Sequence, residues 1–322
     1  MNTVFANIMY KLLAFLMSLS ILGCGFSTPE NTEPIMSKDS ESVKLSAVYW
    51  GDTQVSDYMP ERQKNVLAAC MDVKNAAETI DALIIAGDIA ENGKIAEYKL
   101  ILDDLKSITT VRHFIPATGN HDIRLRLFSQ TVKTFGDFVG ELEPDIKIDK
   151  LYYSYEINGY SFIVLGSART VFEEAYIDEE ELVWLDAQLA SATAEGKPAF
   201  VILHQPLKFT HNLPNAWNSP FDFAGSVGAQ SDEIIATLNK YDNVFLLTGH
   251  LHSGLGENNF EQVGNFISVN VPSVGIVSKD GGFEAAGTGY MIEVYENSVL
   301  FRARNFVAGA YMPEYDREFS LR

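Results

Sequence analysis

Short apolar runs alternate with segments of helical period along most of the chain. Five runs rich in β-branched residues, at 44–50, 82–86, 112–116, 199–203 and 243–247, are typical of buried strands. Apolar residues that recur with a period near 3.6 predict helices at about 61–79, 94–107, 124–139, 178–194 and 230–240. This alternation predicts a layered α/β domain.

Hairpin signals appear in the second half of the chain. Residues 152–157 and 160–165 flank Asn158-Gly159, a dipeptide typical of two-residue hairpin turns. Further strands are predicted at 266–271, 290–295 and 299–306, the last two joined by a turn at 296–298. Helix-connected strands followed by hairpins predict mixed sheets, and in such folds functional residues gather in the loops at strand ends.

The N-terminal segment differs from the rest of the chain. Residues 12–22 form an apolar run that suits the core of a signal peptide and is too short to span a bilayer comfortably. The run ends in I-L-G-C, which resembles the lipobox of bacterial lipoproteins, where the signal is cut before a cysteine that is then lipidated. We expect a signal peptide at 1–23 and a lipid on Cys24. An ordinary secretory signal is the alternative, and translation starts at Met1 or Met9.

Residues 24–43 are rich in Ser, Thr, Pro and acidic residues, which predicts a flexible tether. The remaining residues, 44–322, are then one globular domain. Cys70, the other cysteine, lies on the apolar face of a predicted helix and is expected to be a buried thiol. Because of the expected signal peptide and the lipid on Cys24, we expect the protein outside the cytoplasm, attached to the outer membrane or cell surface.

The charge of the chain limits its partners. The formal net charge is −19, and no run of basic residues occurs, whereas nucleic-acid binding needs clustered Lys and Arg. An acidic surface weakly repels anionic membranes, so the expected membrane contact is the N-terminal lipid only. A small phosphate substrate remains compatible with this charge if bound metal ions reverse the field locally.

Each of the five alternating strands ends in residues of metal-binding type. In chain order these are Asp52 and Gln54, Asp88, Asn120 and His121, His204, and His250 and His252. Singly, each has an ordinary explanation as a turn residue, a helix cap or a core histidine. Together they indicate one site. His113, inside a predicted strand, and His211 fall outside this pattern, and His113 is expected to be structural.

The donor types of this set indicate which ions it binds. Mixed oxygen and nitrogen donors suit Mn²⁺, Zn²⁺ or Fe better than Ca²⁺ or Mg²⁺. The set is too large for one ion and large enough for two, and a shared carboxylate can bridge ions roughly 3.5–4 Å apart. The residues therefore predict a dinuclear metallohydrolase.

The blocks D-x-Q, G-D-x-x-E-N-G, G-N-H-D, H-Q-P and G-H-x-H, in this order, resemble the calcineurin-like metallophosphoesterase superfamily from about residue 45 to 306. The resemblance implies a four-layer αββα sandwich with mixed sheets. It implies one ion bound by Asp52, Asp88 and His252, and a second bound by Asp88, Asn120, His204 and His250. Asp88 would then bridge the two ions.

The same resemblance assigns proton transfer. His121 takes the place of the family's proton donor to the leaving alkoxide, and Glu91 takes the place of its acidic partner, usually Asp. Gln54 departs from the family, which usually has His there; an amide is a weaker donor, so this ion should bind less tightly. Asn92 stands where protein Ser/Thr phosphatases have Arg, which disfavours that activity.

These observations predict a metal-dependent phosphoesterase that hydrolyses phosphomono- or diesters outside the cytoplasm. A non-catalytic surface lipoprotein that retains the fold for binding is the alternative. The aromatic residues of the stretch 205–223 either cover the metals and stack on a substrate ring or only anchor a long loop. The acidic stretch from 172 to 181 is expected to be a solvated loop and the first turn of a helix.

Overall fold

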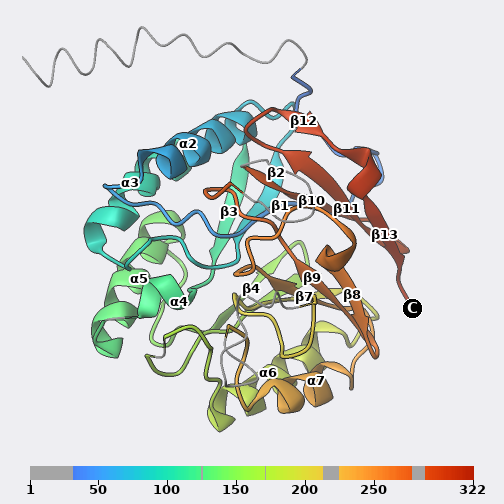
Figure 1. The fold of residues 1–322 in the computed structure, drawn as a ribbon. Helices are drawn as coiled ribbons and strands as arrows, with labels where there is room; N and C mark the ends of the chain where they lie inside the picture. The colour runs from blue at the N-terminus through green and yellow to red at the C-terminus, as the bar shows by residue number, and fades with distance from the viewer. Residues whose placement is uncertain (1–31, 125, 171, 213–224, 278–286) are drawn as a thin grey trace, which may run out of the picture. The chain divides into compact units, whose positions relative to one another are not determined.

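Two mixed β-sheets pack face to face, and helices cover their outer faces (Figure 1). The computed structural model describes residues 32–322 except 125, 171, 213–224 and 278–286. Residues 33–322 form one compact unit. Helices, sheet, sheet and helices make four layers, so the expected αββα sandwich is confirmed.

The first sheet has the order β12-β11-β10-β1-β2-β3, and β13 pairs with β11. Its strands are β1 (Leu45–Trp50), β2 (Ile80–Ile85), β3 (Val111–Pro116), β10 (Thr288–Val294), β11 (Ser298–Asn305), β12 (Ala310–Tyr311) and β13 (Arg317–Ser320). The strands β1, β2 and β3 are parallel, and Trp50, Ile85 and Pro116 lie side by side at their ends. The loops that follow these three strands therefore leave the sheet at one edge.

The second sheet has the order β4-β5-β6-β7-β9-β8. Its strands are β4 (Tyr153–Ile157), β5 (Tyr160–Val164), β6 (Ala199–Ile202), β7 (Val244–Thr248), β8 (Phe260–Val263) and β9 (Phe266–Asn270). The strands β5, β6, β7 and β9 are parallel, whereas β4 and β8 pair antiparallel at the two edges. The hairpin predicted at Asn158-Gly159 is the β4–β5 turn.

The helices lie on opposite sides of the sheet pair (Figure 1). The first sheet is covered by α2 (Pro60–Lys74), α3 (Ile95–Lys106) and α5 (Phe128–Leu142), and the second by α6 (Glu179–Ala192) and α7 (Ser231–Leu238). One-turn elements are α4 (Asn120–Ile123), η2 (Glu257–Asn259) and η4 (Pro313–Tyr315). No helix among the described residues is both long and apolar enough to cross a membrane.

Side chains of the second sheet alternate between two cores. Phe200 stacks on Phe245 with ring centres 5.7 Å apart, and Phe245 reaches Phe301 of the first sheet at 5.7 Å. The neighbouring residues Val201 and Leu246 instead pack with α6 and α7. Because both faces are buried, these parallel strands are continuous apolar runs in the sequence.

Residues 33–43 pack on the domain, so the predicted tether of 24–43 is wrong for this part. Ile35 is fully buried, and its carbonyl oxygen accepts a hydrogen bond from Ala77 N at 2.9 Å. The buried Arg304 donates to the carbonyl oxygen of Glu33 and forms a bidentate ion pair with Asp72 at 2.7 Å. The buried side chains of Ile35 and Ser37, the latter bonded to Glu78, and the contacts of Arg304 order a segment whose composition predicts flexibility. The expected signal peptide and Cys24 lie outside the described residues.

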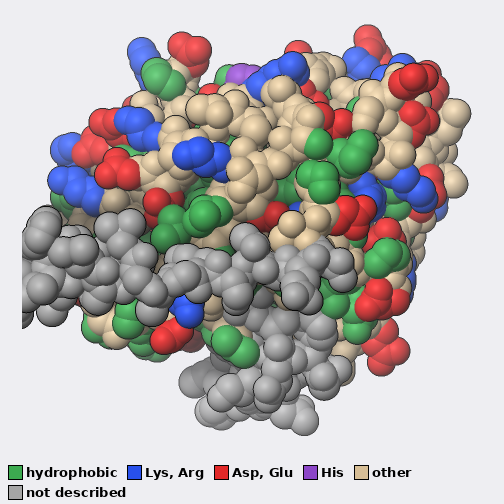
Figure 2. All heavy atoms as spheres, turned by 90° about the horizontal axis from the view of Figure 1, so that it is seen from above, with side chains coloured by type: hydrophobic (Ala, Val, Ile, Leu, Met, Phe, Trp, Pro, Cys, Tyr) green, Lys and Arg blue, Asp and Glu red, His purple; other side chains and the backbone are tan. Residues whose placement is uncertain are grey.

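Other differences concern short elements. The edge strands β8, β12 and β13 were not predicted, because short edge strands that are only partly buried lack a continuous apolar run. The helix expected at 124–139 begins later, at Phe128, after the separate turn α4. Cys70 is buried in α2, as predicted. The surface seen from above carries basic and acidic side chains interspersed with one another (Figure 2).

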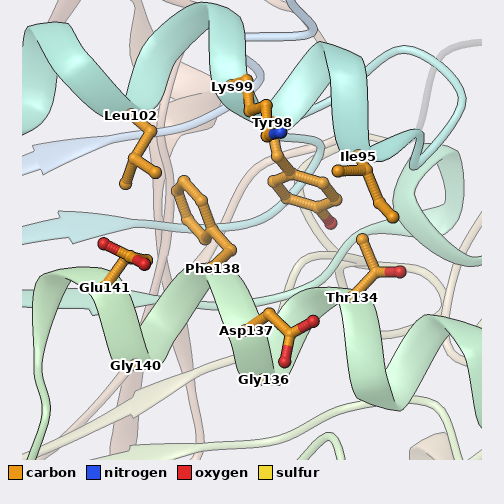
Figure 3. Close-up of a pocket in the computed structure, with 10 residues that line it drawn as sticks. All are labelled: Ile95, Tyr98, Lys99, Leu102, Thr134, Gly136, Asp137, Phe138, Gly140 and Glu141. Carbon is orange, nitrogen blue, oxygen red and sulfur yellow. The ribbon is translucent and has the colours of Figure 1, made fainter.

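A cavity of about 570 Å³ lies between α3 and α5. Figure 3 shows Leu102 and Phe138 on its walls, with Gly136 and Gly140 leaving room on α5. The ring of Tyr98 also lines this cavity, and its hydroxyl donates to Asp122 Oδ1 at 2.9 Å. Tyr98 thereby connects the helix pair to the loops at the strand ends.

Candidate metal centre

The loops at the strand ends of both sheets meet in one buried cluster. Asp52, Asp88 and Asn120 follow β1, β2 and β3 of the first sheet, and His204, His250 and His252 follow β6 and β7 of the second. All six are buried except His252, which is partly exposed. The cluster is therefore assembled by the face-to-face packing of the sheets.

Asp88, His204 and His250 form one group that could hold a metal ion, with one donor atom from each within 4.8 Å of the others. His204 Nε2 lies 3.2 Å from Asp88 Oδ2, and His250 Nδ1 lies 3.2 Å from His204 Nε2. The other ring nitrogen of His204, Nδ1, donates to the carbonyl oxygen of Ala86 at 2.7 Å. This bond fixes the ring so that Nε2 faces the centre.

Asp52, Asp88 and His252 form a second such group, again with donor atoms within 4.8 Å. His252 Nε2 lies 3.0 Å from Asp52 Oδ1, and Gln54 Nε2 donates to Asp88 Oδ2 at 3.1 Å. Asp88 belongs to both groups. The carboxylates and imidazoles thus fall into two groups that share one carboxylate.

Two buried amide oxygens could also bind metal ions in this cluster. Gln54 Oε1 and Asn120 Oδ1 have no hydrogen-bond partner among the described residues, although both side chains are at most 1% exposed. Leaving a buried carbonyl oxygen unpaired costs about 1–3 kcal/mol. A cation beside each oxygen would remove this cost, so the donor set fits two metal ions.

The backbone is strained at the residues of this cluster. Positive φ angles occur at Asp52 (55°), Gln54 (37°), Asp88 (49°), His250 (74°) and His252 (52°). Such angles are uncommon outside glycine and cost of order 1–3 kcal/mol each. Their concentration in one cluster indicates that these side chains are held in place at a cost in local backbone stability.

Glycines allow the two carboxylates to approach the neighbouring loops. A Cβ atom on Gly119 would lie 2.1 Å from Asp88 Oδ1, and one on Gly249 would lie 2.7 Å from Asp52 Oδ2. Both distances are far below van der Waals contact. The glycine that precedes Asn120 or His250 in the sequence motif therefore makes room for a carboxylate from another strand end.

The charges of the cluster favour a cation at its centre. Burial alone would lower the pKa of His204, but the carboxylates of Asp88 and Asp52 raise it to about 9. Burial alone would raise the pKa of Asp88, but the His204 ring holds it below its usual value. Burial and the neighbouring His204 keep the pKa of His250 well below normal, so its ring is neutral and suited to metal binding.

His121 lies at the side of this cluster. Its Nε2 is 4.0 Å from Asp88 Oδ2, whereas Nδ1 is 3.5 Å from Glu91 Oε1 and 2.9 Å from the Glu91 carbonyl oxygen. Burial lowers the pKa of His121, but Glu91 and Asp88 outweigh burial and raise it. Arg62 forms an ion pair with the Glu91 carboxylate. The ring therefore points one nitrogen at the cluster and the other at Glu91.

Arg124 also touches this ring, with Nη2 2.7 Å from His121 Nδ1. A neutral imidazole donates to the Glu91 carbonyl oxygen if Nδ1 is protonated, and accepts from Arg124 if it is not. In the second case the proton is on Nε2, the atom that faces the cluster. Arg124 favours this tautomer, whereas the Glu91 carbonyl oxygen favours a proton on Nδ1.

Two acidic residues beside the cluster were not predicted from the sequence. Asp122 accepts hydrogen bonds from the backbone of Ile89, Ala90 and Gly119, and so ties the loop after β2 to the loop after β3. It could have been noticed as the last residue of G-N-H-D. Glu173 accepts from Asn120 Nδ2 at 2.9 Å, so the expectation of a purely solvated acidic loop is wrong at this position. Nothing in the sequence around Glu173 predicts its contact with Asn120.

Asn92, His113 and His211 belong to neither donor group. Asn92 bonds to Glu97 at 3.0 Å and so supports the loop before α3. His113 lies in β3 beside Glu143, as expected for a structural residue. His211 is buried and bonds to Ser268 Oγ at 2.7 Å. The aromatic residues Trp217 and Phe221 lie outside the described residues.

Comparison with known proteins gives relatives of one kind. A family model described as calcineurin-like phosphoesterase matches residues 49–254. A probable cyclic nucleotide phosphodiesterase of Fibrobacter succinogenes is 27% identical over 59% of this chain and 64% of its own length. A 3′,5′-cyclic-nucleotide phosphodiesterase of Nostoc sp. is 25% identical over 59% and 62%. A probable glycerophosphodiester phosphodiesterase of Arcobacter nitrofigilis is 26% identical over 56% and 59%. The matches thus span about three fifths of these relatives.

Solved structures share the fold. A dimetal phosphatase from Danio rerio superposes with a TM-score of 0.56 at 12% identity, over 87% of this chain and 100% of that one. A purple acid phosphatase from yellow lupin seeds superposes with a TM-score of 0.62 at 14% identity, over 86% and 53%. At these identities the likeness shows the sandwich architecture alone.

Proposed function

The chain belongs to the calcineurin-like phosphoesterase family, and from this premise we propose that it hydrolyses small phosphodiesters with the help of two metal ions. The observation that carries the proposal is the pair of overlapping donor groups that share Asp88. Two orphaned amide oxygens, Gln54 Oε1 and Asn120 Oδ1, complete the donor set. The names of the relatives favour diesters over monoesters as substrates.

The residues divide the binding of the ions as follows. Asp52, Gln54, Asp88 and His252 would hold one ion, and Asp88, Asn120, His204 and His250 the other. Mn²⁺, Zn²⁺ and Fe suit this mixture of oxygen and nitrogen donors. When bound, two such ions supply Lewis-acid charge for the phosphate and lower the pKa of a water molecule.

His121 and its neighbours would handle the leaving group. An alkoxide that leaves phosphorus needs a proton, and His121 Nε2 faces the side of the cluster where Asp88 lies. Glu91 and Arg124 hold the other nitrogen of the ring. His121 would therefore donate from Nε2 while its orientation stays fixed.

The test compares two substrates with the same leaving group. The protein, loaded in turn with Mn²⁺, Zn²⁺ or Fe²⁺, should turn over bis(4-nitrophenyl) phosphate with a kcat/KM at least about tenfold above that for 4-nitrophenyl phosphate, equivalent to about 1.4 kcal/mol of selective transition-state binding. Two bound ions without turnover of either ester would instead support a lipoprotein that only binds. A reversed ratio would identify a monoesterase.

We also propose that Cys24 carries a lipid that attaches the protein to the cell envelope. The proposal rests on the I-L-G-C sequence after an apolar run and on Gly25, which favours an outer-membrane destination over retention in the inner membrane of a Gram-negative host. Wild-type full chain should fractionate with membranes, and Cys24→Ala should remain unprocessed. Soluble wild-type protein with an unmodified Cys24 would contradict the anchor.

A further inference from the structure

Glu173 bonds directly to a residue of the proposed metal centre, although it belongs to neither donor group. It lies between β5 and α6, and its carboxylate Oε2 accepts from Asn120 Nδ2 at 2.9 Å. Its other oxygen, Oε1, accepts from Arg124 Nη1 at 3.2 Å. Gln205, the neighbour of His204, donates to the Glu173 carbonyl oxygen at 3.2 Å. Side chain and backbone of Glu173 are therefore both held in place.

We propose that Glu173 is a positioning residue that sets the orientation of the Asn120 amide. The two ends of an asparagine amide have nearly the same shape, so packing alone selects weakly between them. Only the oxygen can bind a cation; the NH₂ group would repel it. A carboxylate accepts hydrogen bonds and donates none, so Glu173 selects the orientation in which Nδ2 points toward it.

The oxygen atom of the Asn120 amide is placed as this role requires. With Nδ2 bonded to Glu173, Asn120 Oδ1 is buried and has no hydrogen-bond partner among the described residues. Such an oxygen is left available for the ion that Asp88, His204 and His250 would share. The inference rests on the proposed function only as far as that ion; it requires no particular substrate.

Arg124 allows a carboxylate to lie close to this centre. Glu173 is half-buried, and burial raises its pKa while the Arg124 guanidinium opposes that effect. The same guanidinium contacts His121 Nδ1. Arg124 therefore links the positioning of the metal-binding amide to that of the proposed proton donor.

The first experiment titrates metal-stripped full-length protein with Mn²⁺ by calorimetry. Glu173→Ala should weaken one of the two ions by about 10–100-fold and leave the affinity of the other within error. The matched control is Glu174→Ala, which removes the same charge from the neighbouring position and should leave both affinities unchanged. Equal weakening of both ions, or the same loss in the control, would overturn the inference.

A double-mutant cycle tests whether the effect passes through the amide. In an Asn120→Asp background the ligand has no N–H to donate, and Glu173 can only repel it. Adding Glu173→Ala there should leave Mn²⁺ affinity unchanged or raise it, in contrast to the loss expected beside Asn120. A tenfold or larger loss in both backgrounds would show that Glu173 acts in another way. Because no substrate is used, this result is independent of the phosphodiesterase assay.

Discussion

Asp88→Asn is expected to weaken both metal ions and to lower turnover of a phosphodiester by about 10³-fold or more. Asp88 is the one residue that belongs to both donor groups. An amide oxygen brings no negative charge to either ion, and the charge stabilisation that such ions supply is worth several kcal/mol, with about 1.4 kcal/mol for each factor of ten in rate. Metal content after dialysis, together with kcat at saturating Mn²⁺, measures both effects.

The choice of Asn keeps the backbone effect small. Asp88 has a φ of 49°, and Asn is among the residues that best tolerate this region. Gln54→His is the matched change at the same centre, because it replaces a weak amide donor by an imidazole beside Asp52 and His252. It should tighten one ion and leave the other unchanged. Two ions bound at wild-type affinity in Asp88→Asn would refute the bridge.

His121→Ala is expected to retain both ions and to lose about 10²–10⁴-fold in rate on diesters with poor leaving groups. The loss should shrink for a nitrophenyl ester, because nitrophenolate leaves without needing a proton. The backbone N–H of His121 donates to Asp88 Oδ1 at 2.8 Å, a bond that alanine preserves. Steady-state kinetics over a series of leaving-group pKa values measures the difference.

Glu91→Gln serves as the companion variant for this prediction. It keeps the shape of the side chain that faces His121 Nδ1 and removes its charge. It should therefore show a smaller loss with the same dependence on the leaving group. If His121→Ala lost the same factor on good and poor leaving groups, the ring would serve to orient the phosphate rather than to donate a proton.

Much of the fold and the centre could be read from local patterns. The apolar runs predicted β1, β2, β3, β6 and β7 to within two residues at each end, because strands that are mostly buried on both faces are largely apolar; β3, with Arg112 and His113 near its start, is the least regular of them. The polar residues that follow these runs are the ones that the structure brings together. Parallel strands place their carboxyl ends at one edge, so position along the chain predicts proximity there.

Contacts between distant segments could not be read in this way. The sequence gives no signal that Glu173 bonds to Asn120, 53 residues away, or that Arg62 pairs with Glu91. These contacts depend on how loops after different strands pack, and no periodicity records that. Ile35 is a similar case: the segment around it is rich in polar residues, and the segment's contacts come from residues far along the chain, such as Arg304 of β11 and Tyr311 of β12.

The sequence alone thus determined the element types, the αββα architecture through its family resemblance, and the donor residues that could meet at the strand ends. The tertiary structure decided which atoms face one another: His204 Nε2 toward Asp88 at 3.2 Å, and Asn120 Nδ2 toward Glu173 at 2.9 Å. The physical reason is that burial and backbone hydrogen bonding act on neighbouring residues and leave a local pattern. The orientation of a buried ring or amide is instead set by partners from other strands and loops, which only the packed sheets bring into reach.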